Sequence, residues 1–156
     1  MKNILVAVSL MIASFLCLAE SEVGRVNHIG LAVKDLAASE AFFVEYGGFE
    51  AFGHDPEYPA AFMDNGHITI TLWQVEDPAT ATPFHRRKNI GLHHLALEVA
   101  TMEGLYALYE QLKQDPSVEI EFAPEFMGNG PSKHMMVYEP SGIRIEFMHR
   151  VPRVKD

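Results

Sequence analysis

Short runs in which apolar and polar residues alternate occur between residues 28 and 149, and this period of two is typical of strands with one buried face. One such run, HIGLAV at 28–33, recurs sixty-six residues later as HLALEV at 94–99, with His, Leu and Val at matching positions. A repeat of this length predicts two copies of one structural unit.

Each copy then changes to a helical pattern. In the first, Asp35 is a suitable N-cap for a helix over 36–46, and Gly47-Gly48 can end it because glycine adopts the left-handed conformation easily. In the second, Thr101 is the predicted cap, and Asp115-Pro116 end the helix. Its apolar residues recur at spacings of three and four and form one stripe: Met102, Leu105, Leu108, Tyr109 and Leu112.

Three further strands follow each predicted helix. They are expected at 49–52, 60–63 and 68–75 in the first copy and at 118–122, 134–138 and 143–149 in the second. The order predicts an α+β fold in which two βαβββ modules form a curved mixed sheet around a central site. The predicted organisation is a first module at 25–77, a connector at 78–90, a second module at 91–150 and a C-terminal tail at 151–156.

The first nineteen residues differ from the rest. Lys2 precedes an apolar or small stretch from residue 4 to residue 19, and Cys17-Leu18-Ala19 has small residues where signal peptidase cleavage requires them. The segment 1–19 therefore predicts a cleaved signal peptide and an exported protein, with a retained membrane anchor as the alternative. Cys17 is the only cysteine, which excludes disulfide scaffolds and cysteine-ligated zinc.

Charge narrows the range of partners. Twelve Lys and Arg against twenty-one Asp and Glu give a net charge of −9, so a nucleic-acid groove is not expected. The one basic run, Arg86-Arg87-Lys88, could capture a substrate carboxylate, although charged clusters in connectors are usually solvated.

Strand alternation assigns three metal-ligating residues to one side. With Ile29, Leu31 and Val33 facing the helix, His28 faces the other way, and His94 and Glu146 follow the same rule in the second copy. Two imidazoles and a carboxylate with open coordination positions are typical of sites for divalent iron and related ions. Each of these residues alone is more often structural, but the two histidines occupy the same place in a repeat. His28, His94 and Glu146 are therefore the predicted metal ligands.

The chain resembles the vicinal oxygen chelate superfamily of glyoxalases, extradiol dioxygenases, and fosfomycin- and bleomycin-resistance proteins. The residues that carry the resemblance are VNHIGLAVKDL at 26–36, GLHHLALEV at 91–99 and EPSGIRIE at 139–146. It implies the same three ligands, and it places Thr71 where the superfamily has a further carboxylate. Because a hydroxyl is a poor base toward a carbon-bound proton, a plain glyoxalase reaction is disfavoured. The three-ligand pattern is similar to that of extradiol dioxygenases and manganese-dependent fosfomycin-modifying transferases.

The same resemblance implies roles for residues near the predicted ligands. Met136 stands where extradiol dioxygenases carry a tyrosine, and His134, on the same strand face, is the predicted catalytic acid or base. A structural histidine bonded near the loop 128–130 is the alternative. The predicted substrate-binding residues are Thr69, Thr71, Trp73 and Met136; Trp73 could stack on a conjugated substrate or lie at a rim.

The expected function is that of a metalloenzyme with dioxygenase-like or glyoxalase-like lyase or isomerase chemistry on a small, oxygen-rich substrate bound through two oxygens. Fe²⁺ or Mn²⁺ is favoured as cofactor, with Ni²⁺ and Zn²⁺ as alternatives. The resemblance implies a homodimer. A metal-free or non-catalytic binding protein, like the bleomycin-resistance branch, is the competing interpretation.

Overall fold

The structure is a computed structural model that describes residues 24–152. The predicted signal segment 1–19, with Cys17, lies outside the described residues, as do the last four residues of the predicted tail. Within 24–152, no helix is long and apolar enough to cross a membrane.

Module 1 has the predicted βαβββ order. It contains β1 (His28–Val33), α1 (Leu36–Gly47), β2 (Glu50–Asp55), β3 (Ala60–Asp64) and β4 (Thr69–Gln74). The sheet order is β1-β4-β3-β2, with β1 parallel to β4 and the other pairs antiparallel. The carboxylate of Asp35 accepts a hydrogen bond from the Ala38 backbone N–H at the start of α1, and Gly48 ends the helix at φ 67°. The predicted helix signals are confirmed at both ends.

Module 2 repeats this plan. It contains β5 (Leu95–Glu98), α2 (Met102–Leu112), β6 (Glu119–Phe126), β7 (Lys133–Tyr138) and β8 (Arg144–His149). Its sheet order, β5-β8-β7-β6, is equivalent to that of module 1. The side chain of Thr101 caps α2 as expected. β5 begins one residue after His94, so the second strand of the repeat is shorter than the sequence indicated.

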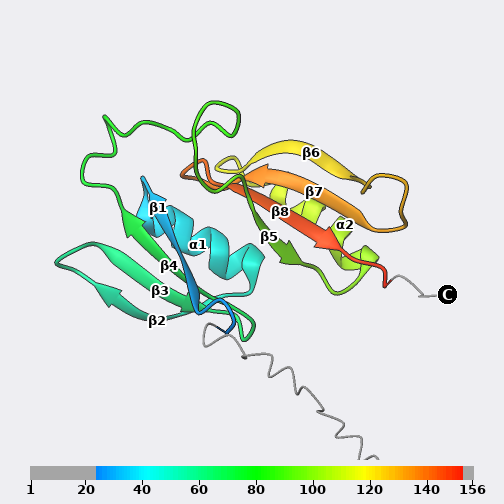
Figure 1. Cartoon of the computed structure of the whole chain (residues 1–156), viewed down its shortest axis with the longest axis horizontal. Coiled ribbons are helices and arrows are strands. Elements are labelled where there is room, and N and C mark those ends of the chain that lie inside the picture. Colours follow the sequence, from blue (N-terminus) through cyan, green and yellow to red (C-terminus); the bar gives the residue numbers. More distant parts are fainter. Residues whose placement is uncertain (1–23, 153–156) are drawn as a thin grey trace, which may run out of the picture.

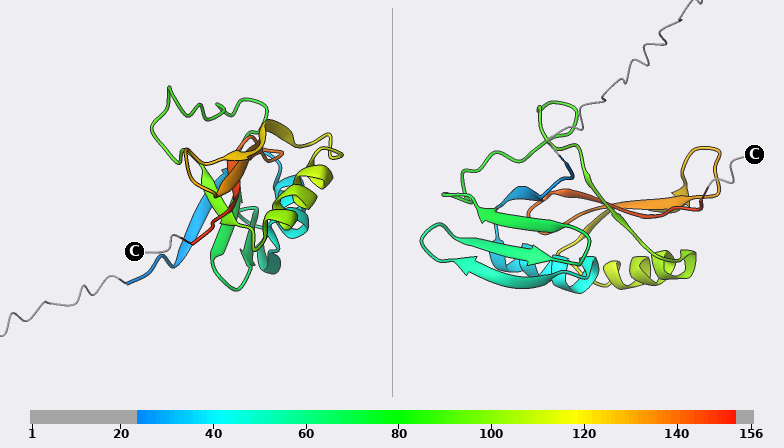
Figure 2. Two further views of the ribbon diagram at one scale, coloured as in Figure 1. Left: turned by 90° about the vertical axis from the view of Figure 1, so that its right-hand side faces the viewer. Right: turned by 60° about the horizontal axis from the view of Figure 1, so that its bottom comes forward.

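The two sheets are separate four-stranded sheets, and the modules lie side by side (Figure 1). Both helices cover the same side of the molecule (Figure 2). The α+β fold of two βαβββ modules is confirmed. The expected closure into one sheet around a central site is not found within a single chain, because β1 and β5, which carry or adjoin the two repeat histidines, are both edge strands of their sheets.

The core lies between the helices and the sheets. It includes Leu31 and Val33 of β1, Phe43 of α1, and Ile145 and Phe147 of β8, all buried. The strand residues in this set are those that alternation assigned to the helix side. Burial of this apolar set fixes the register of each strand, since a shift by one residue would expose it.

Polar contacts join the modules at the start of α1. The Ser39 hydroxyl donates to Oε2 of Glu139 at 2.6 Å and lies 2.8 Å from the Ser141 hydroxyl oxygen. That oxygen also accepts from the backbone N–H groups of Lys34 and Asp35, at 3.0 and 3.2 Å. Glu139 is only 2% exposed, so its carboxylate depends on protein donors such as the Ser39 hydroxyl. The turn before β8 is thereby held against module 1.

Candidate metal and substrate site

The predicted site residues lie on the sheet faces turned away from the helices, called here the open faces. In β1, His28, Gly30 and Ala32 are exposed, whereas Leu31 and Val33 between them are buried. In β8, the alternation places Arg144, Glu146 and Met148 on the open face of module 2.

Strand register makes the two open faces directly comparable. Gly30 pairs with Thr71 across β1 and β4, and Ala96, its equivalent in the repeat, pairs with Glu146 across β5 and β8. Thr71 therefore occupies in module 1 the position that Glu146 occupies in module 2. At this equivalent position the chain has a hydroxyl in module 1 and a carboxylate in module 2.

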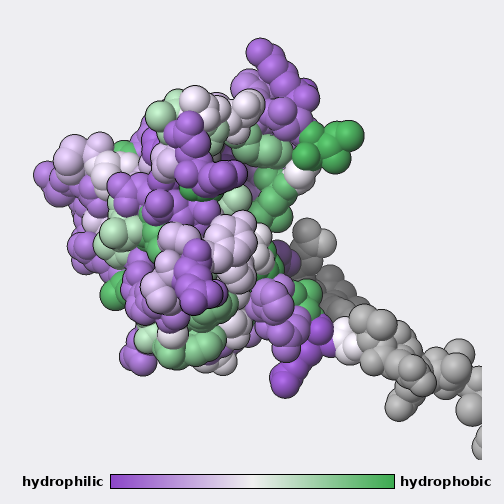
Figure 3. Space-filling model, turned by 90° about the vertical axis from the view of Figure 1, so that its left-hand side faces the viewer, coloured by the Kyte–Doolittle hydropathy of each residue, from purple (hydrophilic) through white to green (hydrophobic). Residues whose placement is uncertain are grey.

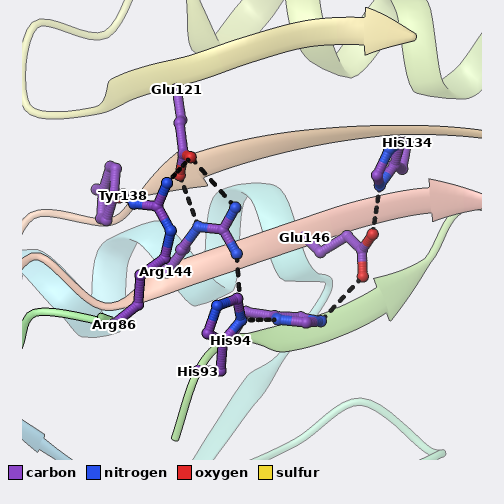
Figure 4. A network of polar contacts seen from close by, with 8 residues as sticks. All are labelled: Arg86, His93, His94, Glu121, His134, Tyr138, Arg144 and Glu146. Carbon is purple, nitrogen blue, oxygen red and sulfur yellow. Dashed lines mark hydrogen bonds and ion pairs between the residues drawn. The ribbon is translucent and has the colours of Figure 1, made fainter. Parts of the chain in front are cut away.

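Two histidines contact Glu146 in module 2 (Figure 4). Nε2 of His94 lies 3.2 Å from Oε2 of Glu146, and Nδ1 of His134 lies 2.5 Å from Oε1 of the same carboxylate. Glu146 is 6% exposed, and the ring of His134 packs against that of Phe122 at 5.1 Å between centroids. A nearly buried carboxylate held by two imidazoles is thus present without any contribution from module 1.

His28 does not join this cluster within the chain. It is exposed at the start of β1, where its Nδ1 contacts Oδ1 of Asn27 at 2.8 Å. Among residues 24–152, no group of three His, Cys, Asp or Glu side chains is arranged to hold a metal ion. The expected convergence of His28, His94 and Glu146 inside one chain is therefore corrected, because His28 lies on a different sheet. Their assignment as ligands stays a prediction.

The open face of module 1 is largely aromatic. Nε1 of Trp73 donates to the Thr71 hydroxyl at 2.8 Å, and the Trp73 ring lies 5.0 Å from that of Tyr58 and 5.7 Å from that of Phe62. Gly30 has no side chain beneath them, and a Cβ there would lie 3.3 Å from Oγ1 of Thr71. Thr71, 6% exposed, thus orients Trp73.

Thr69 and Met136 complete the predicted substrate-binding residues. The Thr69 hydroxyl donates to Oδ2 of Asp64 at 2.5 Å, and this hydrogen bond is the main cause that lowers the pKa of Asp64. Met136 is 3% exposed and pairs with Glu146 across β7 and β8. The Thr69 hydroxyl proton is therefore already donated to Asp64, and Met136 lies beside the Glu146 carboxylate.

A network of arginines adjoins the Glu146 cluster on the same face (Figure 4). Nε of Arg144 donates to Oε2 of Glu121 at 2.6 Å, and Nη2 of Arg86 lies 2.8 Å from Oε1 of that carboxylate. The hydrogen bond from Arg144 holds the pKa of Glu121 below its ordinary value. Burial raises the pKa of Tyr138, whose hydroxyl accepts from Arg86 at 3.0 Å. Arg144 received no predicted role, although its spacing of two from Glu146 in an alternating strand was the available signal.

His93 lies beside His94, although consecutive residues of a strand would face opposite sides. The two Nδ1 atoms lie 2.9 Å apart, and Nδ1 of His93 is 3.5 Å from Nη1 of Arg144. Strand alternation does not apply here because β5 begins only at Leu95. Desolvation, followed by the positive charge of Arg144, lowers the pKa of His93.

A cavity of about 820 Å³ opens elsewhere, between the modules. Its lining includes Tyr46, His67, Glu98 and Phe147 and none of the predicted site residues. The candidate site is therefore an open sheet face in the single chain.

The sequence from residue 25 to residue 147 matches the family model of the Glyoxalase/Bleomycin resistance protein/Dioxygenase superfamily. The chain belongs to this superfamily. The predicted resemblance is thus confirmed over nearly all of the described residues. No match was found among curated proteins.

Solved structures of the superfamily share the fold. A putative glyoxalase from Bacillus halodurans is 25% identical, with 81% of this chain and 96% of that chain covered and a TM-score of 0.68. A glyoxylase/bleomycin resistance protein/dioxygenase domain from Frankia sp. EAN1pec is 21% identical, with 83% and 99% covered and a TM-score of 0.69. The fosfomycin resistance protein FosX from Listeria monocytogenes is 17% identical, with 83% and 95% covered and a TM-score of 0.65. Members of the superfamily are often enzymes, commonly use divalent metals, bind small molecules and often form dimers.

Proposed function

We propose that the protein is an exported, metal-dependent enzyme of the superfamily, acting on a small substrate that presents two neighbouring oxygens. The observation that carries this proposal is the pairing of His94 with the nearly buried carboxylate of Glu146. His28 occupies in module 1 the position that His94 occupies in the repeat of module 2. His94 and Glu146 are two of the three donors of the expected ligand set, and such a set suits Fe²⁺ or Mn²⁺.

A second copy of the chain would supply the third donor. β1 and β5 are edge strands, and an exposed strand edge is a surface that proteins commonly cover. The connector before β5 adds exposed apolar residues, Phe84, Ile90 and Leu92, within ten residues of His94. In contrast, the end of the molecule formed by module 1 is mainly hydrophilic, with apolar patches between (Figure 3). A symmetric dimer that brings β1 of one copy to β5 of the other would place His28 against His94 and Glu146.

The chemistry follows from what each group can hold. A metal bound there would hold two substrate oxygens and stabilise the negative charge that develops on one of them. His134 orients Glu146 through its Nδ1 atom, which leaves Nε2 to exchange a proton with a bound substrate. Nε2 of His134 lies 3.9 Å from Oε1 of Glu125.

The module 1 side of the site lacks a strong base. Thr71 stands in the position equivalent to Glu146 and accepts a hydrogen bond from Trp73, so it cannot remove a proton from carbon at a useful rate. This supports dioxygenase-like chemistry or addition to a metal-bound substrate over glyoxalase-type isomerisation. The indole of Trp73 is positioned to contact a conjugated part of the substrate.

Metal content tests the proposal. The full chain, without a His tag, is expected to retain about one Fe²⁺ or Mn²⁺ per chain after reconstitution and desalting, measured by inductively coupled plasma mass spectrometry. His28→Ala and Glu146→Ala should each lose it, because removing one of three donors weakens the site steeply. Thr71→Ala is the matched control on the open face and should retain it. Wild-type protein that holds no metal after reconstitution would instead favour a metal-free binding protein.

A further inference from the structure

Two guanidinium groups on the open face of module 2 share a single carboxylate. Arg144 contacts Glu121 through Nε at 2.6 Å and through Nη2 at 3.2 Å, and Arg86 reaches the same carboxylate at 2.8 Å. Among the described residues, no carboxylate other than Glu121 lies within salt-bridge distance of either arginine. The cluster therefore carries one positive charge in excess, in a chain whose net charge is −9.

The excess charge lies beside the proposed ligands. Arg144 and Glu146 are two positions apart in β8, about 7 Å along a strand, and their side chains are on the same face. Contacts from Arg144 through His93 to His94 join the arginine cluster to the Glu146 cluster (Figure 4). Within the part of the chain that the structure describes, Nη1 of Arg144 contacts only the ring of His93, at 3.5 Å, so it keeps donor capacity for a ligand.

Arg86 is set apart from the other basic residues of its run. It crosses from the connector to Glu121 and Tyr138, and it is half-buried, whereas Arg87 and Lys88 are exposed. A solvated connector charge has no such anchor. Tyr138 and Glu121 thus hold the Arg86 guanidinium at the edge of the face that carries Glu146, in a fork suited to carboxylates and other oxyanions.

We infer that this cluster binds an anionic group of the substrate, so that the substrate is an organic acid whose charged end lies on Arg144 and Arg86 while its other oxygens face the metal ligands. Only the placement of the other substrate oxygens at the metal ligands rests on the proposed function. Arg144, Glu121 and Tyr138 belong to module 2, and Arg86 belongs to the connector of the same chain, so binding of the anion requires neither the metal nor the dimer.

Benzoate and benzamide form a suitable pair of probes, because they have similar size and shape and differ in charge. Their affinities for the metal-free full chain would be measured by ligand-detected NMR. The wild type should bind benzoate roughly 10-fold or more tightly than benzamide, which is the effect of a hydrogen-bonded charge pair. Arg144→Met should abolish this preference, and Arg144→Lys should keep part of it. Arg87→Met is the matched control, since it removes the same charge from the exposed connector, and should change neither affinity.

Glu121→Gln separates an anion site from a merely structural ion pair. Removing the carboxylate that competes for both arginines should tighten benzoate binding and leave benzamide unchanged. The inference is overturned if the wild type shows no preference for benzoate, if Arg144→Met preserves it, or if Glu121→Gln weakens benzoate binding as Arg144→Met does. Metal retention is measured separately. If the wild type prefers benzoate but retains no metal after reconstitution, anion binding by the arginine cluster is supported and the proposed metal-dependent enzyme is refuted.

Discussion

Subunit complementation offers the sharpest test of a site shared between two copies. His28 lies on the sheet of module 1, whereas His94 and Glu146 lie on that of module 2, and one chain does not bring the three together. We therefore expect that His28→Ala and Glu146→Ala, each unable to hold metal alone, restore a metal site when the two variants form a mixed dimer.

The size of the effect follows from the symmetry. In a mixed dimer, one site combines both substitutions and is lost, whereas the other combines the intact His28 of one copy with the intact Glu146 of its partner. Random pairing of equal amounts makes about half of the dimers mixed, so roughly one quarter of all sites should be intact. Purified mixed dimer should hold about one metal ion per two chains.

The assay requires the two variants to be co-expressed with different histidine-free affinity tags. Sequential purification isolates the mixed dimer, and metal is then counted by mass spectrometry. A mixed dimer formed from His28→Ala and the double variant His28→Ala/Glu146→Ala is the control, because it has no complete ligand set. Mixed dimer without metal, in a protein whose wild type retains it, would refute the shared site.

Two further predictions concern stability. Ser39→Ala removes one of two donors to the buried Glu139 carboxylate, so urea titration should show a free energy of unfolding lower by about 1.5–3 kcal/mol, the range for a hydrogen bond to a charged group. Thr82→Ala, on the exposed connector, should change it by less than about 0.5 kcal/mol, and an unchanged Ser39→Ala would contradict the Glu139 contact. Burial, together with a 3.1 Å hydrogen bond to Asp115, raises the pKa of Tyr46 from 10.0 to about 12. Its neutral form therefore stabilises the fold fully below pH 10, and this contribution is lost as the pH rises toward 12. The thermal stability of Tyr46→Phe should decline less than that of the wild type over this interval, and parallel curves would refute the burial of Tyr46.

Local patterns predicted most of the fold. The caps Asp35 and Thr101, the left-handed Gly48 and the alternation in β1 act within a few residues, so they can be read from a single segment. His93 shows where this reading fails. Its orientation depends on where β5 begins, and that start depends on pairing with β8, fifty residues away in sequence.

The candidate site was predicted in part. The repeat indicated His94 and strand alternation indicated Glu146, and their contact needs only the pairing of β5 with β8 in one module. His28 was assigned to the same point, but a repeat specifies equivalent positions and does not specify how the two sheets are placed. The role of Glu121 also escaped prediction, because its partners Arg86 and Arg144 come from the connector and from a distant strand.

By itself, the sequence determined the two βαβββ modules and the residues that face each core, since periodicity and repeat symmetry are properties of the chain. The family resemblance added Thr71 as the counterpart of Glu146. Only the tertiary structure decided that the two sheets stay separate, that β1 and β5 are free edges, and that two arginines meet at one carboxylate beside Glu146. These features arise from contacts between segments far apart in the chain, and the packing of whole modules sets such contacts, which no local pattern encodes.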